Sequence, residues 1–570
     1  MNFLTGRIGF LKQRPWLLVG LVCALFLLAA KGAYKGYFHP DDLDNIAWTS
    51  VAETRTFLEG FTFPKFFPWN FRPLGHYYFR VLSRSAGLNF TPYVVVIQSF
   101  HLLNVVLVWL ITATFGMKTM ARLAAVIFFA FHSAVFDIYY RPMYVFDLFC
   151  ATFCLLTILL WRKEWFWLGL VTFWCAYKSK ELAILLPLVL TLIELWFGAK
   201  RWKRLIPFYL ISLNFGVQAL LFRNPEANAY SLIFTSEAVN KTLAFYTPLI
   251  FCAPLLLCLP VLLWARDRRV YFGLLMALLL FGPMLFVPGR LYGAYLYLPL
   301  AGVALAIGAF ADRSERTAVV TLALLCLAWQ PLQYKFLREY RNGTLAEGAN
   351  HRAYVRGIRQ ISLIKPGITH VFVENAPETM AFWGTDGALR FIYKNPDLKV
   401  THLNLGIPEH MGVGESILLL SWDAVKQRFN FMSHMKDEPE TSMITMGSVT
   451  PVWQLEQGFL GVTGAFSWTA PHAEARLLRP EGAKAFEVTV NVGPDYIRQV
   501  KKVTLRVKVD GEQIGERTFT MKGWERTEWP VALKPAGMVK VEFDVDPPLK
   551  TADGDQRILG IPIATFGYVE

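Results

Sequence analysis

The chain has 570 residues, of which 54% are hydrophobic, 15% aromatic and 18% charged. This charged fraction lies below the roughly 25% of soluble domains, which excludes a wholly soluble protein. The net charge of +14 would suit a nucleic-acid binder, but much of the basic charge lies in short loops between apolar runs, where it sets membrane topology. We therefore expect an integral membrane protein with a soluble part and no nucleic-acid partner.

Apolar runs approaching the roughly 20 residues of a bilayer crossing recur up to Tyr334. The first, residues 15–33, follows basic residues like a signal peptide, but it lacks a good cleavage site, so we expect an uncleaved helix. Ten further spans are predicted, which makes about eleven in a membrane-spanning domain of residues 1–340: 93–116, 122–135, 143–161, 165–177, 182–197, 205–222, 243–264, 270–287, 292–310 and 318–334.

The basic loops orient this α-helical bundle. With a cytoplasmic N-terminus, the five loops predicted inside carry Lys118 and Arg122; Arg162 and Lys163; Lys200, Arg201, Lys203 and Arg204; Arg266, Arg268 and Arg269; and Arg313 and Arg316. Short basic loops on one side obey the positive-inside rule. An odd number of spans then puts everything after Tyr334 outside. We expect a multi-pass protein of the cytoplasmic (inner) membrane with a periplasmic C-terminal domain.

The first outer loop, residues 34–91, begins with His39-Pro-Asp41-Asp42-Leu-Asp44. Carboxylates beside an apolar medium are costly unless they have partners or a task. Capping of a helix that starts near Asp44 is one task, and Asp44 is the natural cap. A general base or a cation site at Asp41 and Asp42 is the other. The loop continues with a predicted surface helix and an aromatic segment, residues 61–78, which form a rim at headgroup level.

Most polar residues at the predicted helix ends fall on the same outer side. Ionisable groups at such depth usually line a site. Each also has a structural alternative: arginine and lysine side chains reach lipid phosphates, a carboxylate pairs with a neighbouring cation, and Tyr139-Tyr140-Arg141 anchors the interface. His101, in mid-span, is predicted to be packed and hydrogen-bonded. The candidate cavity residues are Arg72, His76, Tyr140, Arg141, Lys180, Glu181, Arg290 and Tyr292.

Beyond Tyr334 the composition becomes that of a soluble region. Residues 342–358 are polar with three glycines and predict a linker, within a small α/β region of residues 341–455. Residues 456–570 show short alternating runs separated by turns such as Asp510-Gly511, which predicts an extracytoplasmic β-rich domain, a β-sandwich. The predicted strands are 485–492, 503–509, 516–521, 539–545 and 558–567. The last cysteine is Cys326, so this part has no disulfides. Trp468 is expected in the β-domain core.

An outward acidic pair, outward cations and a lipid-facing aromatic rim suit glycosyl transfer from a polyprenyl-phosphate sugar. The isoprenoid tail lies in the bilayer, the phosphate leaving group needs cationic contacts, and the acceptor hydroxyl needs a carboxylate base.

The order of these residues also resembles a family. One span precedes Asp41-Asp42, then Phe71-Arg72-Pro73-Leu74 follows, then Lys180-Glu181 heads a Leu/Pro-rich span, and Arg290-Leu-Tyr292 comes late in the bundle. This resembles class C membrane glycosyltransferases, especially the protein O-mannosyltransferase-like branch, and it is similar to lipid A aminoarabinose transferases. The resemblance implies that Asp41 is the base that activates the acceptor, that Asp42 positions Asp41 or the acceptor, and that Arg72 and Arg290 contact the donor phosphate. We expect an inverting transfer, with Lys180 as a further contact to that phosphate.

Other readings stay open at this point. A lipid or glycan transporter (flippase) would need mid-span charges and paired halves, but the sequence shows few such charges and no internal symmetry. A glycan-binding receptor would use the β-rich domain. The acceptor is a glycan, a lipid or a protein. Asp41 and Asp42 fit metal-free base catalysis, and with Asp44 they also fit Mg²⁺ or Mn²⁺. No other cofactor is implied.

Overall fold

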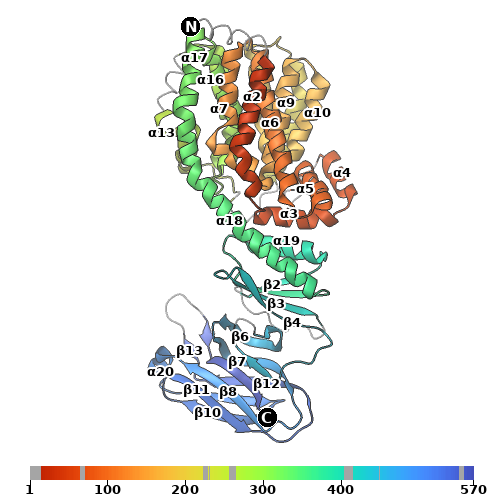
Figure 1. Cartoon of the computed structure of the whole chain (residues 1–570), viewed down its shortest axis with the longest axis vertical. Coiled ribbons are helices and arrows are strands. Elements are labelled where there is room, and N and C mark those ends of the chain that lie inside the picture. The colour runs from red at the N-terminus through yellow and green to blue at the C-terminus, as the bar shows by residue number, and fades with distance from the viewer. Residues whose placement is uncertain are drawn as a thin grey trace. The chain divides into compact units, whose positions relative to one another are not determined.

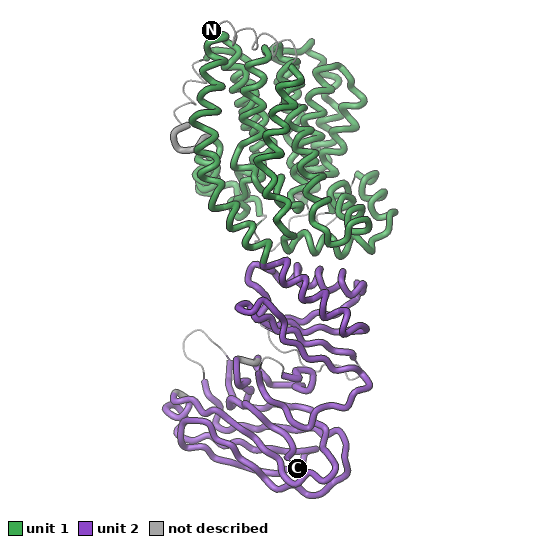
Figure 2. Tube along the Cα trace, viewed as in Figure 1, with its two compact units in different colours: residues 1–349 green, residues 350–570 purple. Residues whose placement is uncertain are grey.

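The computed structural model describes residues 15–64, 71–221, 229, 231–255, 265–403, 415–447, 450–550 and 557–569. The chain forms two compact units, Met1–Ala349 and Asn350–Glu570 (Figure 2). The first is helical and the second is rich in β-structure (Figure 1).

The first unit is a bundle in which apolar helices alternate with short connecting segments at its two ends. Its elements in chain order are α2 (Pro15–Ala30), η1 (Lys31–Lys35), α3 (Pro40–Val51), α4 (Thr54–Thr62), α5 (Pro73–Ala86), α6 (Phe90–Thr114), α7 (Thr119–Ala130), η2 (Ser133–Val135), α8 (Phe136–Tyr140), η3 (Pro142–Tyr144), α9 (Val145–Arg162), α10 (Phe166–Ser179), η4 (Glu181–Leu185), α11 (Leu186–Trp196), η5 (Trp202–Leu205), α12 (Ile206–Leu221), α13 (Ser236–Leu255), α15 (Arg268–Phe281), η6 (Gly282–Phe286), η7 (Gly293–Leu296), α16 (Tyr297–Ala311), α17 (Glu315–Leu324), η8 (Leu325–Trp329) and α18 (Gln330–Ile364).

The chain is a multi-pass membrane protein, although the count of eleven spans is not confirmed. Helical structure occupies each of the eleven predicted ranges. Within the described residues, six helices are long and apolar enough to cross a bilayer, and a bent pair formed by residues 119–130 and 133–140 makes a seventh if it is one span. Several of the remaining helices are short because 3₁₀ turns break them, and α13 runs up to residues outside the description.

The five basic loops meet at one end of the bundle. Arg162 donates hydrogen bonds to the carbonyls of Thr114 (2.7 Å) and Phe197 (3.2 Å). Arg201 pairs with Glu164 at 2.8 Å. At the same end, Arg269 pairs with Asp312 (2.8 Å), whose other oxygen accepts the Lys118 N–H. The basic loops therefore lie on one side, as predicted; the assignment of that side to the cytoplasm stays a prediction.

Helices α15 and α16 pack backbone to backbone. A Cβ on Gly273 would lie 2.6 Å from Gly302 O and Ala306 N, and one on Gly302 would lie 2.6 Å from Gly273 O and Ala277 N. Small residues four apart on both helices permit such an approach in membranes. This close seam fixes α16, whose Tyr297 hydroxyl lies 2.8 Å from His101 Nδ1. His101 is thus packed and hydrogen-bonded, as predicted.

The predicted linker at residues 342–358 is wrong, because these residues are helical and belong to α18. Glycine weakens an isolated helix, but here two glycines permit close packing. A Cβ on Gly348 would lie 2.9 Å from the Tyr37 nitrogen, and one on Gly357 would lie 2.7 Å from the Phe429 ring. The division between the two units falls inside this helix, at Ala349.

The second unit holds two main sheets and two further helices, α19 (Phe382–Tyr393) and α20 (Pro494–Val500), with η10 (Val452–Gln454). The smaller sheet has the order β2-β1-β3-β4, with β1 parallel to β2 and β3. The larger sheet has the order β10-β9-β12-β7-β15-β8-β11, with β5 and β6 added. The strands are β1 (His370–Glu374), β2 (Lys399–His402), β3 (Ile417–Asp423), β4 (Arg428–His434), β5 (Met443–Thr445), β6 (Leu455–Thr463), β7 (Phe466–Arg479), β8 (Ala485–Val492), β9 (Val503–Val509), β10 (Glu512–Phe519), β11 (Gly523–Pro530), β12 (Gly537–Asp546), β13 (Leu549–Lys550), β14 (Ile558–Leu559) and β15 (Pro562–Val569).

The C-terminal strands are confirmed, but the β-sandwich is not. Its nine strands belong to a single sheet that curls until its end strands approach each other. Arg517 on β10 pairs with Glu525 on β11 at 2.6 Å, and Gly515 lies against the Trp529 ring. Alternate residues of each strand fill the interior, where Trp468 packs partly buried and stacked on Tyr496. The predicted turn at Asp510-Gly511 joins β9 and β10, with both residues at positive φ.

Candidate functional site

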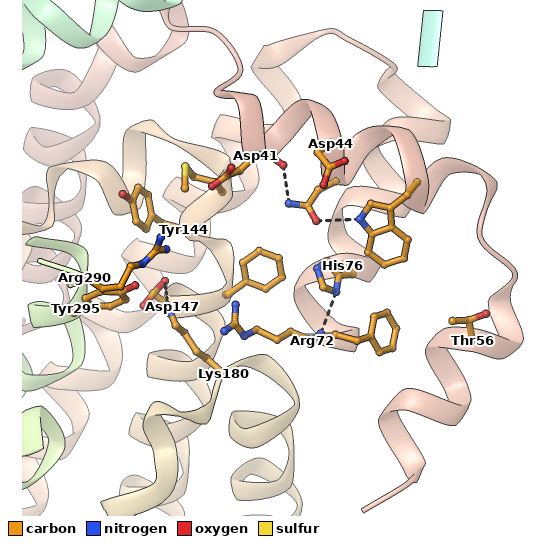
Figure 3. A pocket seen from close by; sticks show the side chains of 15 residues that line it. Asp41, Asp44, Thr56, Arg72, His76, Tyr144, Asp147, Lys180, Arg290 and Tyr295 are labelled. Atoms are coloured by element: carbon orange, nitrogen blue, oxygen red, sulfur yellow. Dashed lines mark hydrogen bonds and ion pairs between the residues drawn. The ribbon is translucent and has the colours of Figure 1, made fainter. Parts of the chain in front are cut away.

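A cavity of about 580 Å³ lies in the first unit, where segments distant in the sequence meet (Figure 3). It combines three carboxylates, three cations and a wall of aromatic rings. Its lining residues are Asp41, Asp44, Asn45, Trp48, Thr56, Phe71, Arg72, His76, Met143, Tyr144, Phe146, Asp147, Lys180, Arg290 and Tyr295. Five residues predicted from sequence, Asp41, Arg72, His76, Lys180 and Arg290, are brought together here.

The first turn of α3 sets the position of Asp41. Pro40, whose ring pre-sets a helical φ, opens the helix after the N-cap residue His39. The Asp42 side chain reaches back to accept the His39 N–H at 2.8 Å, which completes a capping box. Asp41, between them, lines the cavity, and its carbonyl accepts a hydrogen bond from Asn45 at 2.7 Å.

Asp42 takes part in capping α3, whereas Asp44 lines the cavity. Asp42 is 0% exposed and does not line the cavity. Burial raises the pKa of Asp42 well above its usual range. The prediction that Asp44 caps the helix is wrong, because the helix begins four residues earlier; Asp44 lies within α3 and lines the cavity.

The cavity floor holds a buried ion pair between Lys180 and Asp147. Lys180 Nζ lies 2.7 and 2.8 Å from the two Asp147 oxygens and 4.5 Å from the centre of the Tyr295 ring. Burial alone would lower the pKa of Lys180, but the charge of Asp147 raises it above its ordinary value. Lys180 precedes η4 and Asp147 belongs to the first turn of α9, so the pair joins two parts of the bundle.

Arg72, the N-cap residue of α5, forms a two-bonded pair with Glu181, at 3.1 Å from Nε and 2.8 Å from Nη2. Its guanidinium carbon lies 5.6 Å from the centre of the Phe146 ring. The predicted ion-pair role of Glu181 is therefore present, and Glu181 supports Arg72 without lining the cavity itself. Arg72 itself lines the cavity, so its positive charge lies at the cavity wall.

Arg290 approaches the cavity from the segment before η7. Its guanidinium carbon lies 5.0 Å from the centre of the Tyr292 ring. The Tyr246 hydroxyl fixes this segment, because it accepts the Tyr292 N–H at 3.1 Å and donates to the Tyr292 carbonyl at 3.2 Å. Tyr292 itself does not line the cavity; it supports Arg290 from beside it.

Tyr140 and Arg141 do not line the cavity. Tyr140 is buried against Phe136, so the alternative of interfacial anchoring is wrong for it. Arg141 pairs with Asp137 (3.3 Å) and with Glu347 of α18 (3.0 Å). Asp147 was not predicted, although an acidic residue inside an apolar span is a usable signal.

Among the described residues, neither Asp41 nor Asp42 belongs to a group of three side chains that could bind a metal ion together. The one group of three or more ligand residues found in the described part of the chain is His472, Glu474 and Glu542, in the second unit. There the Lys540 ammonium lies 2.7 Å from Glu474 and 3.5 Å from Glu542. A lysine thus already supplies positive charge to these two carboxylates.

His76 gives the site a pH dependence. Its Nδ1 accepts the Arg72 N–H at 3.0 Å, and burial, followed by the charge of Arg72, lowers its pKa to about 3. In the unfolded chain the His76 imidazole is protonated below about pH 6.5, whereas in the folded protein it stays neutral down to about pH 3. Stability should therefore fall on acidification through this window, by up to about 1.4 kcal/mol per pH unit. In His76→Asn, which keeps an acceptor, thermal unfolding in detergent should lose this part of the pH dependence; an unchanged profile would contradict the assignment.

No protein-family model and no curated protein matches the chain. Among solved structures, the chain is similar to ArnT from Cupriavidus metallidurans bound to undecaprenyl phosphate, with 13% identity, 73% of this chain and 97% of that chain covered, and a TM-score of 0.43. It is also similar to the arabinofuranosyltransferase AftD from Mycobacteria, with 12% identity, 97% of this chain and 58% of that chain covered, and a TM-score of 0.42. Both are class C membrane glycosyltransferases. At TM-scores below 0.5, neither likeness assigns a role to any residue of this chain.

Proposed function

We propose that the protein is an inverting glycosyltransferase that moves a sugar from a polyprenyl-phosphate donor to an acceptor hydroxyl. The observation that carries this proposal is the cavity itself. Three cations and three carboxylates from separate segments of the bundle line this cavity of about 580 Å³. A lipid-phosphate sugar carries one anionic group and one polyol at the end of an apolar chain, and this mixture of charges and rings matches it.

The donor phosphate is assigned to Arg72, Lys180 and Arg290. Each of these cations lines the cavity, and each lies near an aromatic ring, of Phe146, Tyr295 and Tyr292 respectively. Charge-assisted hydrogen bonds from such groups are strongest to an oxyanion, and negative charge on the phosphate grows as the bond to the sugar breaks. The cations would therefore stabilise the leaving group more in the transition state than in the bound donor.

Asp41 is assigned as the base. The acceptor hydroxyl gives its proton to the Asp41 carboxylate while its oxygen forms a bond to the anomeric carbon. The bond from that carbon to the phosphate oxygen breaks, and polyprenyl phosphate leaves with the electron pair. One displacement inverts the anomeric centre. Asp42 supports this step by capping α3 and so holding the turn that carries Asp41.

The proposal places the reaction on the outer face of the cytoplasmic membrane, with a hexose or a pentose as the transferred sugar. The test uses the purified full chain with a panel of polyprenyl-phosphate hexoses and pentoses and candidate acceptors, and it follows the release of polyprenyl phosphate and the anomeric configuration of the product. Release of polyprenyl phosphate with an inverted product would support the proposal. Transbilayer movement of an intact donor would instead identify a flippase, and acceptor binding without cleavage would identify a receptor.

The loss of one cation should weaken donor use. For Arg290→Gln, the KM for donor should rise by about 10- to 100-fold, because a hydrogen bond to a charged group contributes about 1.5–3 kcal/mol. Arg313→Gln, which removes an exposed arginine at the end of the bundle with the basic loops, is the matched control and should keep its KM within twofold. Equal KM values in the two variants would remove Arg290 from the donor site.

We further propose that catalysis does not use a divalent cation. Transfer should keep its rate after exhaustive treatment with a strong chelator, because a carboxylate base needs no metal. A rate that falls with chelation and returns with Mg²⁺ or Mn²⁺, but not with Zn²⁺, would instead place an oxygen-ligated metal at Asp41.

A further inference from the structure

A second cavity of about 420 Å³ lies at the end of the bundle where the basic loops meet. It is lined by Glu164, Trp165, Phe166, Trp167, Leu168 and Arg204. Helix α9 runs between the two cavities: Asp147 of the first lies in its first turn, and Glu164 of the second lies two residues beyond its last residue, Arg162. At 1.5 Å per residue, about 25 Å separate them. The reaction proposed above makes no use of this cavity.

Buried and half-buried bonds hold the two loops that form the cavity. Arg201 lies 2.8 Å from Glu164 and 3.3 Å from Glu194. Glu194, fully buried, also accepts the Trp161 indole N–H at 2.9 Å and the Arg201 N–H at 2.9 Å. Both glutamates are thus committed to arginine, and the α9–α10 turn is tied to the segment before η5.

Positive charge surrounds the cavity in excess. Residues 162–168 and 197–205 contain six lysines and arginines against one glutamate, a net charge of +5. Lys163, Lys200, Lys203 and Arg204 are exposed. No carboxylate within the described ranges lies at ion-pair distance from any of these four.

The exposed aromatic side chains at this cavity indicate that its ligand is a lipid. Trp167 is 75% exposed and Trp165 56%, and Trp202 beside Lys203 is also exposed. Tryptophan gathers where acyl chains meet headgroups, with its ring on carbon and its N–H in the polar layer. An apolar wall next to unpaired positive charge at this depth is complementary to a lipid that carries negative charge in its headgroup.

We propose that this cavity binds the headgroup of an anionic glycerophospholipid, with Arg204 on the phosphate and Trp165 and Trp167 on the glycerol and the first acyl carbons. Arginine suits this role because its planar N–H fork matches two phosphate oxygens. Lys203, next in sequence, adds charge. A zwitterionic lipid carries its own ammonium group, so the cavity should prefer phosphatidylglycerol to phosphatidylcholine.

The test measures lipid binding by the purified full chain in neutral detergent. Native mass spectrometry with added phosphatidylglycerol or phosphatidylcholine gives the dissociation constant of the tightest lipid. We expect at least tenfold tighter binding of phosphatidylglycerol, and a loss of at least tenfold in K203Q/R204Q. The matched control is R313Q/R316Q, which removes the same charge from exposed residues at the same end but outside the cavity; its affinity should change less than twofold. Thermal unfolding in lipid-free detergent checks that both double variants fold.

Three results would overturn the proposal. Equal losses in the two double variants would show attraction to diffuse positive charge and no site. Equal affinities for the two lipids would remove the role of the headgroup charge. Tighter binding of polyprenyl phosphate than of phosphatidylglycerol, lost in K203Q/R204Q, would assign the cavity to the donor lipid.

Discussion

Replacing Asp41 with asparagine should slow sugar transfer by about 10²- to 10⁴-fold, the usual contribution of a positioned general base. Asparagine keeps the shape of the side chain and cannot take the acceptor proton. The capping box between His39 and Asp42 and the bond from Asn45 to the Asp41 carbonyl do not involve the replaced carboxylate. The loss should therefore appear in kcat, measured with saturating polyprenyl-phosphate sugar, and little in the affinity for donor.

The matched control for this variant is Glu53→Gln. Glu53 is an exposed carboxylate between α3 and α4, and it does not line the cavity. Its rate should stay within twofold of the wild type. Asp44 is the alternative base in the cavity, so Asp44→Asn belongs in the same series. If Asp44→Asn loses the rate and Asp41→Asn keeps it, the base is one turn further along α3.

Replacing Asp147 with asparagine should destabilise the fold by about 3–5 kcal/mol, because it leaves the Lys180 ammonium buried without its counter-charge. Lys180 is 8% exposed and Asp147 5% exposed, and both carboxylate oxygens contact the ammonium. The effect should be a large fall in the temperature of unfolding in detergent. Lys180→Met alone should cost a similar amount, since the carboxylate is then uncompensated.

The double variant D147L/K180M distinguishes a buried pair from two independent residues. It removes both charges together, so its stability should exceed that of either single variant, whereas its transfer activity should be lost with the Lys180 ammonium. Asp397→Asn, an exposed position in the second unit, is the control for a simple loss of charge and should stay within about 0.5 kcal/mol of the wild type. Additive losses in D147L/K180M would contradict the pairing.

Site residues could be predicted from the sequence where a charged residue lies at the end of an apolar run. Asp41, Arg72, Lys180 and Arg290 lie at helix ends predicted on one side, and they line one cavity. Asp147 was not predicted as a site residue because it lies within the apolar run 143–161 and its partner, Lys180, is 33 residues further along the chain. The burial of Asp42 escaped because its capping partner is a histidine, which is not among the usual N-cap residues.

The fold was predictable where periodicity is strong. The ranges of β8 and β9 match the prediction to the residue, because alternation of core and surface positions defines them. The helix across residues 342–358 was missed because a polar stretch with several glycines normally marks a linker. The need for glycine is visible only in the structure, where Gly348 lies against Tyr37 and Gly357 against Phe429. The closure of the C-terminal sheet depends on which strands pair across long connections, and strand periodicity carries no information on that.

The backbone contact between α15 and α16 restricts how a lipid tail reaches the cavity. The polyprenyl tail of the proposed donor would need a lateral opening wide enough for its methyl branches, and the α15–α16 seam at Gly273 and Gly302 offers none. If the proposed function holds, the donor tail enters the bundle elsewhere than through this seam. A side chain at either position would force the two helices apart. A changed preference for the length of the donor's polyprenyl tail in Gly273→Ala would therefore show that the tail passes near this seam.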